Sequence, residues 1–302
     1  MADLDELRSV PGVCELVVHR GTSGGPQVLV EVPHGATREA EYHALARTLK
    51  GRLPAQLEHF FFVNTDVGAP EGAAWLGRTL AARGVTVVVA RCLIPRTFID
   101  TNRVVEHDAR GGTLVDGLTP GVPGYLDDAE DLARLVELHA AYHALVGRAY
   151  DAVCGRGGRA LQLHSYAPRS VGIEKTDATI VEALHAAYVP EVYATWPERP
   201  AVDLISATAD GSFRTAPALV ASTRAAYARA GIDAQENATY HLHPATMGLH
   251  YARRFPEQVL CVELNRGLIA DPFTPFGVSP ISEPKVARMV APIAEAIGAP
   301  AR

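Results

Sequence analysis

The sequence contains two matching segments, VLVEVPHG at residues 28–35 and ALQLHS at residues 160–165, and each has the pattern of a short apolar strand that ends in a histidine. In open α/β sheets the ligand site lies at the carboxyl ends of the strands. His34 and His164 are therefore expected to meet at one edge of a sheet. Two histidines in that position predict a metal site, and a metal site predicts an enzyme.

Short β-branched or aromatic segments recur along the chain and alternate with alanine-rich segments of helical periodicity. This alternation predicts an α/β fold of three layers, α/β/α, around a mostly parallel mixed sheet. The strands are expected at 13–18, 27–32, 59–64, 85–91, 160–163 and 258–263, and the helices at 39–50, 71–83, 128–153, 176–187 and 217–230.

The chain is expected to form a single domain over residues 1–302, because it contains no internal repeat and no linker-like stretch. Two loop insertions are expected, near 105–125 and 190–215. The first contains the Gly/Pro-rich stretch 111–124, which has the length of a functional loop. The second has weak periodicity, which predicts an irregular insertion near the site.

The composition excludes several classes of protein. The net charge of −6 argues against a nucleic-acid binder, which would carry a basic patch. No apolar run reaches the roughly 18 residues of a membrane span, and the acidic N-terminus has no signal-peptide pattern. A cytoplasmic location is therefore expected. The four cysteines have no CxxC spacing and are expected to be buried small hydrophobes.

A third metal ligand is expected from another strand end. Catalytic zinc usually has three protein ligands, His or carboxylate, and keeps one position for water. His34 and His164 supply two of them. The segment FFFVNTDVG at 60–68 places Asp66 after an apolar run, with Glu71 as the reserve candidate. For two histidines and one carboxylate the default metal is zinc, with one ion per chain.

A polar cluster follows the strand expected at 85–91, in the segment IPRTFIDTNR at 94–103. Arginine offers a planar fork that binds carboxylates through two hydrogen bonds. Asn102 and Arg103 are therefore predicted to bind a substrate carboxylate, with Asp100 holding one guanidinium in place. The alternative is a solvated loop with an internal Asp–Arg pair.

Glu263 interrupts the segment VLCVELNR at 259–266, which otherwise reads as a buried strand. Burial of a carboxylate is costly unless the group is paired or functional. Glu263 is therefore predicted to be the general base beside a metal-activated water. The alternative is that it only pairs with Arg266 or Arg103.

Three histidines, His241, His243 and His250, lie shortly before the Glu263 strand. The preferred interpretation is a substrate-lining loop in which His241 or His243 orients the substrate or stabilises developing negative charge. A weaker alternative is a second metal that recruits His241 and His243. An exposed His250 without a role is equally compatible with the sequence.

Taken together, these segments resemble the N-formylglutamate amidohydrolase-like proteins, which are related to the zinc carboxypeptidases. The matching pieces occur in family order from about residue 30 to 270. Gly35 directly follows His34, where the family often has serine, and Thr37 replaces the glutamate of the carboxypeptidase His-x-x-Glu spacing. The matching pieces are VPHG (32–35), TDVGA (65–69), PR (95–96), DTNR (100–103), LHS (163–165) and VEL (262–264).

The resemblance implies a phosphorylase/hydrolase-like, zinc exopeptidase-like fold with one zinc, and hydrolysis of a C–N bond in an N-acyl amino acid. Carried over by position, it implies that Arg96 helps Asn102 and Arg103 to bind the substrate carboxylate. The implied zinc ligands are His34, Asp66 and His164, and the implied base is Glu263.

The chain is therefore expected to be a zinc-dependent amidohydrolase of N-acyl amino acids such as N-formylglutamate, with Glu263 and Arg96 as catalytic residues. The substrate is a small molecule or a peptide with a free carboxylate. A carboxypeptidase-like or peptide-modifying zinc hydrolase, acting on a peptide or an ester, is the first alternative. A non-catalytic carboxylate-binding protein is the second, although binding alone would not require a base. The oligomeric state stays open.

Overall fold

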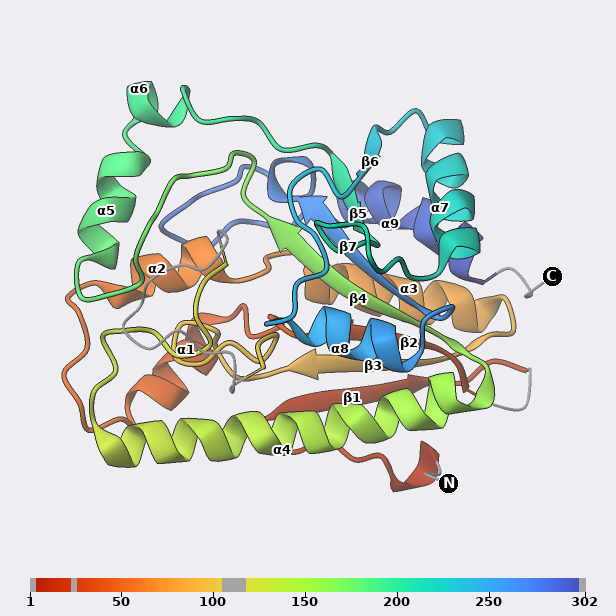
Figure 1. The fold of residues 1–302 in the computed structure, drawn as a ribbon, viewed down its shortest axis with the longest axis horizontal. Helices are drawn as coiled ribbons and strands as arrows, with labels where there is room; N and C mark the ends of the chain where they lie inside the picture. Colours follow the sequence, from red (N-terminus) through yellow and green to blue (C-terminus); the bar gives the residue numbers. More distant parts are fainter. Residues whose placement is uncertain (1–3, 23–25, 105–117, 299–302) are drawn as a thin grey trace.

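The computed structural model describes residues 4–22, 26–104 and 118–298, and in this part of the chain a seven-stranded mixed sheet lies between two layers of helices (Figure 1). The strand order is β1-β3-β2-β4-β7-β5-β6. The central strands β3, β2, β4 and β7 are parallel, whereas β1 and the β5–β6 pair run the other way. The predicted three-layer α/β/α fold is confirmed. The strands are β1 Cys14–His19, β2 Pro26–Val32, β3 Thr86–Cys92, β4 Arg159–Tyr166, β5 Val202–Ile205, β6 Ala234–Glu236 and β7 Val259–Asn265.

Alternate side chains of the central strand β2 supply the two halves of the core, as the pleat of a strand requires. Val28 and Val30 pack with helices α3, α7 and α9 on one face, and Leu29 packs with α4 and α8 on the other. Both faces are covered, which explains why the central strands read as nearly continuous apolar runs. The helices are α1 Glu39–Ala46, α2 Leu57–Asn64, α3 Ala69–Ala82, α4 Ala129–Val153, α5 Ile180–Ala187, α6 Pro190–Tyr193, α7 Pro217–Arg229, α8 Met247–Arg254 and α9 Glu283–Ile297.

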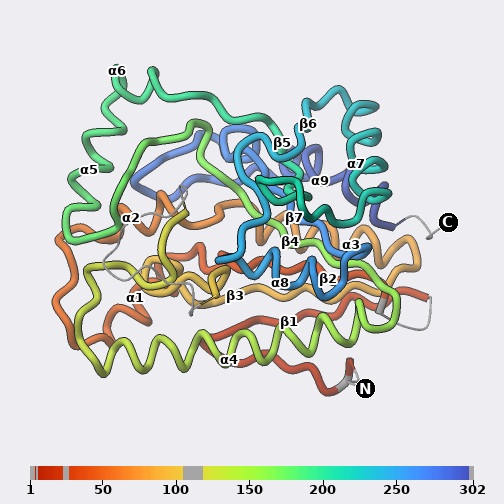
Figure 2. The backbone as a smooth tube through the Cα atoms, viewed as in Figure 1, coloured from red at the N-terminus to blue at the C-terminus, as the bar shows by residue number. Residues whose placement is uncertain are grey.

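Helices α1, α2 and α5 lie beyond the end of the sheet to which the parallel strands point (Figure 2). α2 also contacts α5 directly. These helices form the outer wall at the carboxyl ends of the strands, where a ligand site is expected. No helix among the described residues is long and apolar enough to span a bilayer.

One predicted strand is wrong, because residues 59–64 belong to helix α2. The aromatic run favours a strand by propensity, but Leu57, Phe60 and Phe61 recur at helical spacing and all three are buried. The tertiary packing of this apolar face therefore overrides the local preference.

The second expected insertion is also more ordered than predicted. The segment 190–215 contains helix α6 and strand β5, and β5 pairs with β7 inside the sheet. Most of the first insertion, residues 105–117, lies outside the described residues. Strand β6 and helices α8 and α9 were not predicted. Pro292 inside α9 interrupts the helical pattern of that segment. All four cysteines are free and buried, as expected.

Candidate active site

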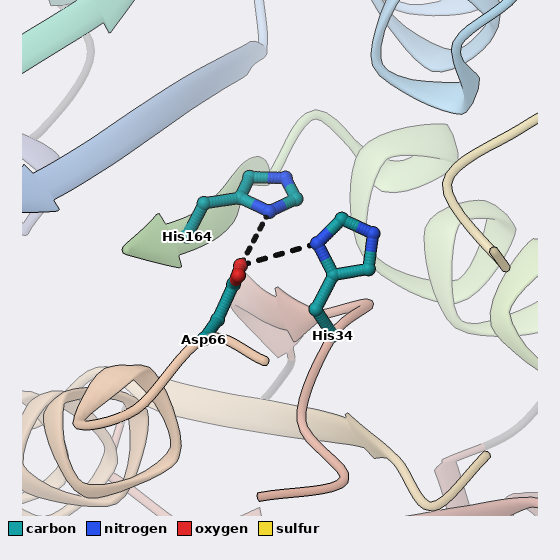
Figure 3. A group of neighbouring side chains, drawn as sticks. All are labelled: His34, Asp66 and His164. Carbon is teal, nitrogen blue, oxygen red and sulfur yellow. Dashed lines mark hydrogen bonds and ion pairs between the residues drawn. The ribbon is translucent and has the colours of Figure 1, made fainter. Parts of the chain in front are cut away.

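Three side chains converge at the carboxyl ends of β2 and β4 (Figure 3). His34 follows β2, His164 lies within β4, and Asp66 follows α2. The Oδ2 atom of Asp66 lies 3.2 Å from Nδ1 of His34 and 2.9 Å from Nδ1 of His164. All three residues are buried. The structure thus brings together the three predicted ligands, although Asp66 arrives from a helix rather than from a strand.

Both imidazoles have a hydrogen-bond partner at Nε2, and these partners hold the rings with their Nδ1 atoms toward Asp66. Nε2 of His34 lies 2.7 Å from Oδ1 of Asp100, and Nε2 of His164 lies 3.3 Å from Oε1 of Gln162. Both partners are acceptors, so each Nε2 is assigned the proton and each Nδ1 keeps a lone pair.

The lone pairs of both imidazoles and an oxygen of Asp66 then face one another in a buried space. Arg96 and Arg266 approach this group, and a metal cation or a proton between the three atoms would satisfy them. Two imidazoles and one carboxylate form a typical donor set for catalytic zinc. Four ligands about 2.0–2.1 Å from zinc lie roughly 3.3 Å apart at tetrahedral angles, close to the spacing seen around Asp66. The residues present therefore fit a zinc ion.

A buried hydrogen-bond chain fixes the orientation of His164. Glu31 pairs in register with Gln162 across β2 and β4, and its Oε2 accepts from Nε2 of Gln162 at 3.1 Å. Glu31 also accepts hydrogen bonds from the hydroxyls of Tyr142 and Tyr150 on α4, at 2.9 and 2.8 Å. The Gln162 amide is thereby held with its oxygen toward His164. Such outer contacts set the tautomer and direction of a metal-binding histidine.

Asp100 plays the corresponding role for His34. It is buried, and its second oxygen accepts from Nη2 of Arg96 at 2.8 Å. Burial opposes ionisation of Asp100, but the positive charges of Arg103 and Arg96 outweigh it and hold the pKa of Asp100 well below its usual value. Asp100 therefore orients His34, one of the three candidate metal ligands, as well as the two arginines, whereas the sequence predicted only the second role.

Asp100→Asn is expected to lower metal affinity by about 10- to 100-fold, because the amide no longer polarises His34 as a carboxylate does. The measurement is a competition titration of the folded protein with a zinc-sensitive chelator. Asp203→Asn is the matched control, since Asp203 is equally buried but accepts from the backbone amides of residues 238–240. Equal affinities of the two variants would show that Asp100 does not orient a metal ligand.

Glu263 lies beside His164 in register across β4 and β7. Its side chain is partly exposed to the cavity described below, but its Oε2 is buried and has no hydrogen-bond partner among the described residues. Burial raises the pKa of Glu263 to about 7, against the opposing charge of His164. A carboxyl group with this pKa and an unpaired oxygen is suited to accept and return a proton.

The pKa of Asp66 is shifted in the opposite direction to that of Glu263. Burial again opposes ionisation, but the charge interaction with His34 and the contacts to both imidazoles outweigh it and lower the pKa of Asp66 below its usual range. Asp66 is therefore available as an anionic ligand, and neighbouring Glu263 as a base. Two carboxyl groups in one site with pKa values pushed in opposite directions indicate different chemical roles.

A cavity of about 230 Å³ opens over these residues, and Arg96, Asn102 and Arg103 line it together with Glu263. The guanidinium of Arg96 lies 3.2 Å from Nδ1 of His34. Arg103 donates to the carbonyl and the hydroxyl of Thr119 at 2.8 and 3.3 Å, which fixes its direction. The predicted polar cluster is therefore buried at the site and is not a solvated loop.

Three further arginines line the cavity, Arg169, Arg199 and Arg266, and the sequence predicted a substrate or metal role for none of them. Arg266 binds the metal-site carboxylate, with Nη2 at 3.4 Å from Oδ1 of Asp66. Its position next to Asn265 at the end of a predicted strand could have revealed it. Arg199 lies over the rings of Tyr166 and Tyr240 and donates to the hydroxyls of Ser170 and Tyr240, with no carboxylate within 4.0 Å among the described residues. Nothing in the local sequence around Arg199 marks it.

The structure places one of the remaining candidate residues at the cavity and two of them away from the site. His241 lines the cavity, whereas His243 is not among its lining residues. Nδ1 of His243 instead accepts from the amide of Ala245 at 3.1 Å, which indicates a role in the shape of the loop. Glu71 is exposed in the first turn of α3 and is not part of the metal cluster, so Asp66 is the carboxylate of this site.

Two solved structures resemble this chain in fold. A crystal structure of N-formylglutamate amidohydrolase from Ralstonia eutropha JMP134 has 17% identical residues and a TM-score of 0.58, and the match covers 93% of this chain and 95% of that chain. A gene product from Agrobacterium tumefaciens has 17% identity and a TM-score of 0.53, over 97% of both chains. These two structures share the fold.

A search of curated proteins finds no significant match. The family model of N-formylglutamate amidohydrolase matches residues 27–270, a span that includes the metal cluster, the arginine segment and Glu263. The chain therefore belongs to the N-formylglutamate amidohydrolase family.

Proposed function

We propose that this protein is a zinc-dependent amidohydrolase that cleaves the amide C–N bond of an N-acyl amino acid, with N-formylglutamate as the first compound to test. The observation that carries this proposal is the convergence of three metal-binding atoms with an unpaired carboxyl oxygen in one cavity. His34, Asp66 and His164 supply the first, and Glu263 supplies the second. Binding of a carboxylate alone would require neither.

The roles of the residues follow from their positions. A zinc ion held by the cluster would supply Lewis acidity, which polarises the scissile carbonyl and activates water. Glu263 takes the proton of the attacking water and returns it to the leaving amine. In this proposal Arg96, whose guanidinium lies beside His34 in the cavity, donates to the carbonyl oxygen as negative charge develops.

Asn102 and Arg103 bind the free carboxylate of the substrate in this proposal. Arg103 is pre-oriented by Thr119, and Asn102, which lines the same cavity, would donate to the carboxylate through its side-chain Nδ2. Arg199, which has no carboxylate partner among the described residues, offers a second anion-binding group for a dicarboxylate such as N-formylglutamate. A peptide C-terminus carries the same carboxylate, and a carboxypeptidase-like activity is the alternative.

Metal content and hydrolysis together test the proposal. Elemental analysis of the purified protein is expected to find about one zinc per chain, and the zinc-loaded protein is expected to release formate from N-formyl-L-glutamate. His164→Ala is expected to lose both metal and activity, whereas His250→Ala, an exposed histidine of α8, keeps both. Absence of zinc uptake by the wild type would remove the proposed mechanism.

Arg103→Ala is expected to weaken substrate binding by about 10- to 100-fold, which is the usual loss for one charged hydrogen-bonding partner. The change is expected mainly in KM for N-acyl amino acids, with a smaller change in kcat. Arg169→Ala is the matched control, because Arg169 lines the same cavity but its guanidinium is held by Trp196 and Glu198. If both variants had similar kinetics, Arg103 would not bind the substrate and would have only a structural role.

A further inference from the structure

We propose that one arm of the cavity, here called the neutral arm, is a subsite for an uncharged aromatic substituent of the substrate that carries a hydroxyl group. The neutral arm is the part lined by α2, α5 and the segments that flank α5. This inference rests on the proposed function, since it names the class of N-acyl amino acid that fills the site. Its lining residues are Phe60, Val63, Asn64, Val171, Ile173, Thr176, Ile180, Leu184 and Tyr188.

The lining of the neutral arm contains no charged side chain. Phe60 of α2 and Ile180 and Leu184 of α5 are almost completely buried. Of the cavity arginines, Arg169 precedes Val171 on the segment before α5, and its guanidinium is held by Trp196 and Glu198. Ligand sites combine apolar walls with a few placed polar groups, so this arm is suited to an apolar group and the opposite part of the cavity to anions.

Two hydroxyls in the neutral arm are buried without a hydrogen-bond partner among the described residues, Oγ1 of Thr176 and the hydroxyl of Tyr188. Thr176 is only 2% exposed. Buried polar groups in native proteins are almost always paired. Burial also raises the pKa of Tyr188 to about 12, so its hydroxyl keeps its proton and can donate. A ligand with its own hydroxyl would give both groups a partner.

The neutral arm lies next to the carboxylate-binding segment. The amide of Asp100 donates to the carbonyl of Gly121, and the amide of Gly124 donates to the carbonyl of Thr176, both at 2.8 Å. Residues 121–124 therefore connect the two parts of the wall. A compound whose carboxylate is held by Asn102 and Arg103 can direct a neighbouring substituent into the neutral arm.

An apolar ring suits this arm better than a glutamate side chain, because its walls are apolar or neutral. Arg96 and Arg266 reach its edge at the carbonyls of Asn64 and Val63, but their guanidiniums are already bound to Asp100 and Asp66. An aromatic ring would instead contact the apolar walls, and a phenol hydroxyl could reach Thr176 and Tyr188. The substituent can belong to the amino acid or to the acyl group, and the experiment below separates the two. N-formylglutamate would leave the neutral arm unfilled in either case.

Calorimetric binding to zinc-loaded Glu263→Gln tests the proposal without requiring turnover. N-formyl-L-tyrosine and N-(4-hydroxybenzoyl)-L-glutamate carry the phenol on the amino-acid side and on the acyl side, respectively. At least one of them is expected to bind tenfold or more tightly than N-formyl-L-glutamate. If neither does so, the proposal is overturned. Hydrolysis by the wild type is measured separately, so a failure of the proposed function is distinguishable from a failure of the subsite.

Removal of single hydroxyls tests the polar part of the neutral arm. Tyr188→Phe and Thr176→Val are each expected to reduce the preference for the phenol over the matching phenyl compound by about three- to tenfold, the usual range for one hydrogen bond. Tyr193→Phe is the matched control. Its hydroxyl is likewise buried with no partner in the described part of the chain, and its ring stacks on Tyr188, but it is not among the residues that line the cavity. An unchanged preference in both test variants would overturn the role of the hydroxyls.

Discussion

Glu263→Gln is expected to retain the metal and to lower kcat by about 10²- to 10⁴-fold, the usual contribution of a positioned general base. The amide keeps the shape of the carboxyl group but cannot accept a proton at neutral pH. Because Glu263 is not one of the three clustered ligands, its replacement leaves the metal-binding atoms in place. The measurement is steady-state hydrolysis of N-formyl-L-glutamate by protein of known zinc content.

Glu182→Gln, an exposed change on α5, controls for the general effect of removing one carboxylate. It is expected to leave both kcat and zinc content unaltered. Near-normal turnover by fully zinc-loaded Glu263→Gln would exclude Glu263 as the base, although the metal cluster would stand. Loss of zinc together with activity would instead place Glu263 among the ligands.

Glu31→Ala is expected to lower the free energy of unfolding by about 3–9 kcal/mol, because three buried donors each lose an acceptor at about 1–3 kcal/mol. The donors are the hydroxyls of Tyr142 and Tyr150 and the amide of Gln162. Urea unfolding of the metal-free protein measures this change. The variant is also expected to bind zinc about tenfold more weakly, since the Gln162 amide is no longer held toward His164.

Tyr142→Phe separates the two effects of Glu31. It removes one of the three donors and leaves the hydrogen bond between Glu31 and Gln162 intact. It is expected to cost about 1 kcal/mol in stability and nothing in zinc affinity. If Glu31→Ala destabilised the protein no more than Tyr142→Phe does, the hydrogen-bond network under His164 would not stabilise the fold as described.

The parallel core and the position of both histidines of the candidate metal site could be predicted from the sequence, because the relevant patterns are local. The strands that bear them are short apolar runs, and the position of His34 and His164 at the ends of such runs already places them at one edge of the sheet. Glu263 could be found in the same way, since a lone acidic residue inside an apolar strand is conspicuous.

Other parts of the site depend on contacts between distant segments. Helix α2 reads as a strand because its aromatic residues favour that state, and only packing selects the helix. Arg199 reaches the cavity because β5 joins the sheet next to β7. No local sequence pattern predicts this pairing of β5 with β7. His243 and His241 differ in position by two residues, yet only His241 lines the cavity.

The order of the ligands along the chain has a consequence for folding. Asp66 and His164 are 98 residues apart, and the strands that bring the histidines together pair in parallel, so the contact is strongly non-local. Non-local parallel pairing forms slowly. A nascent chain therefore cannot assemble this ligand set until β4 has been synthesised and has paired with β2. The metal would consequently bind to an almost finished fold, where it stabilises the native state by mass action instead of guiding the early steps.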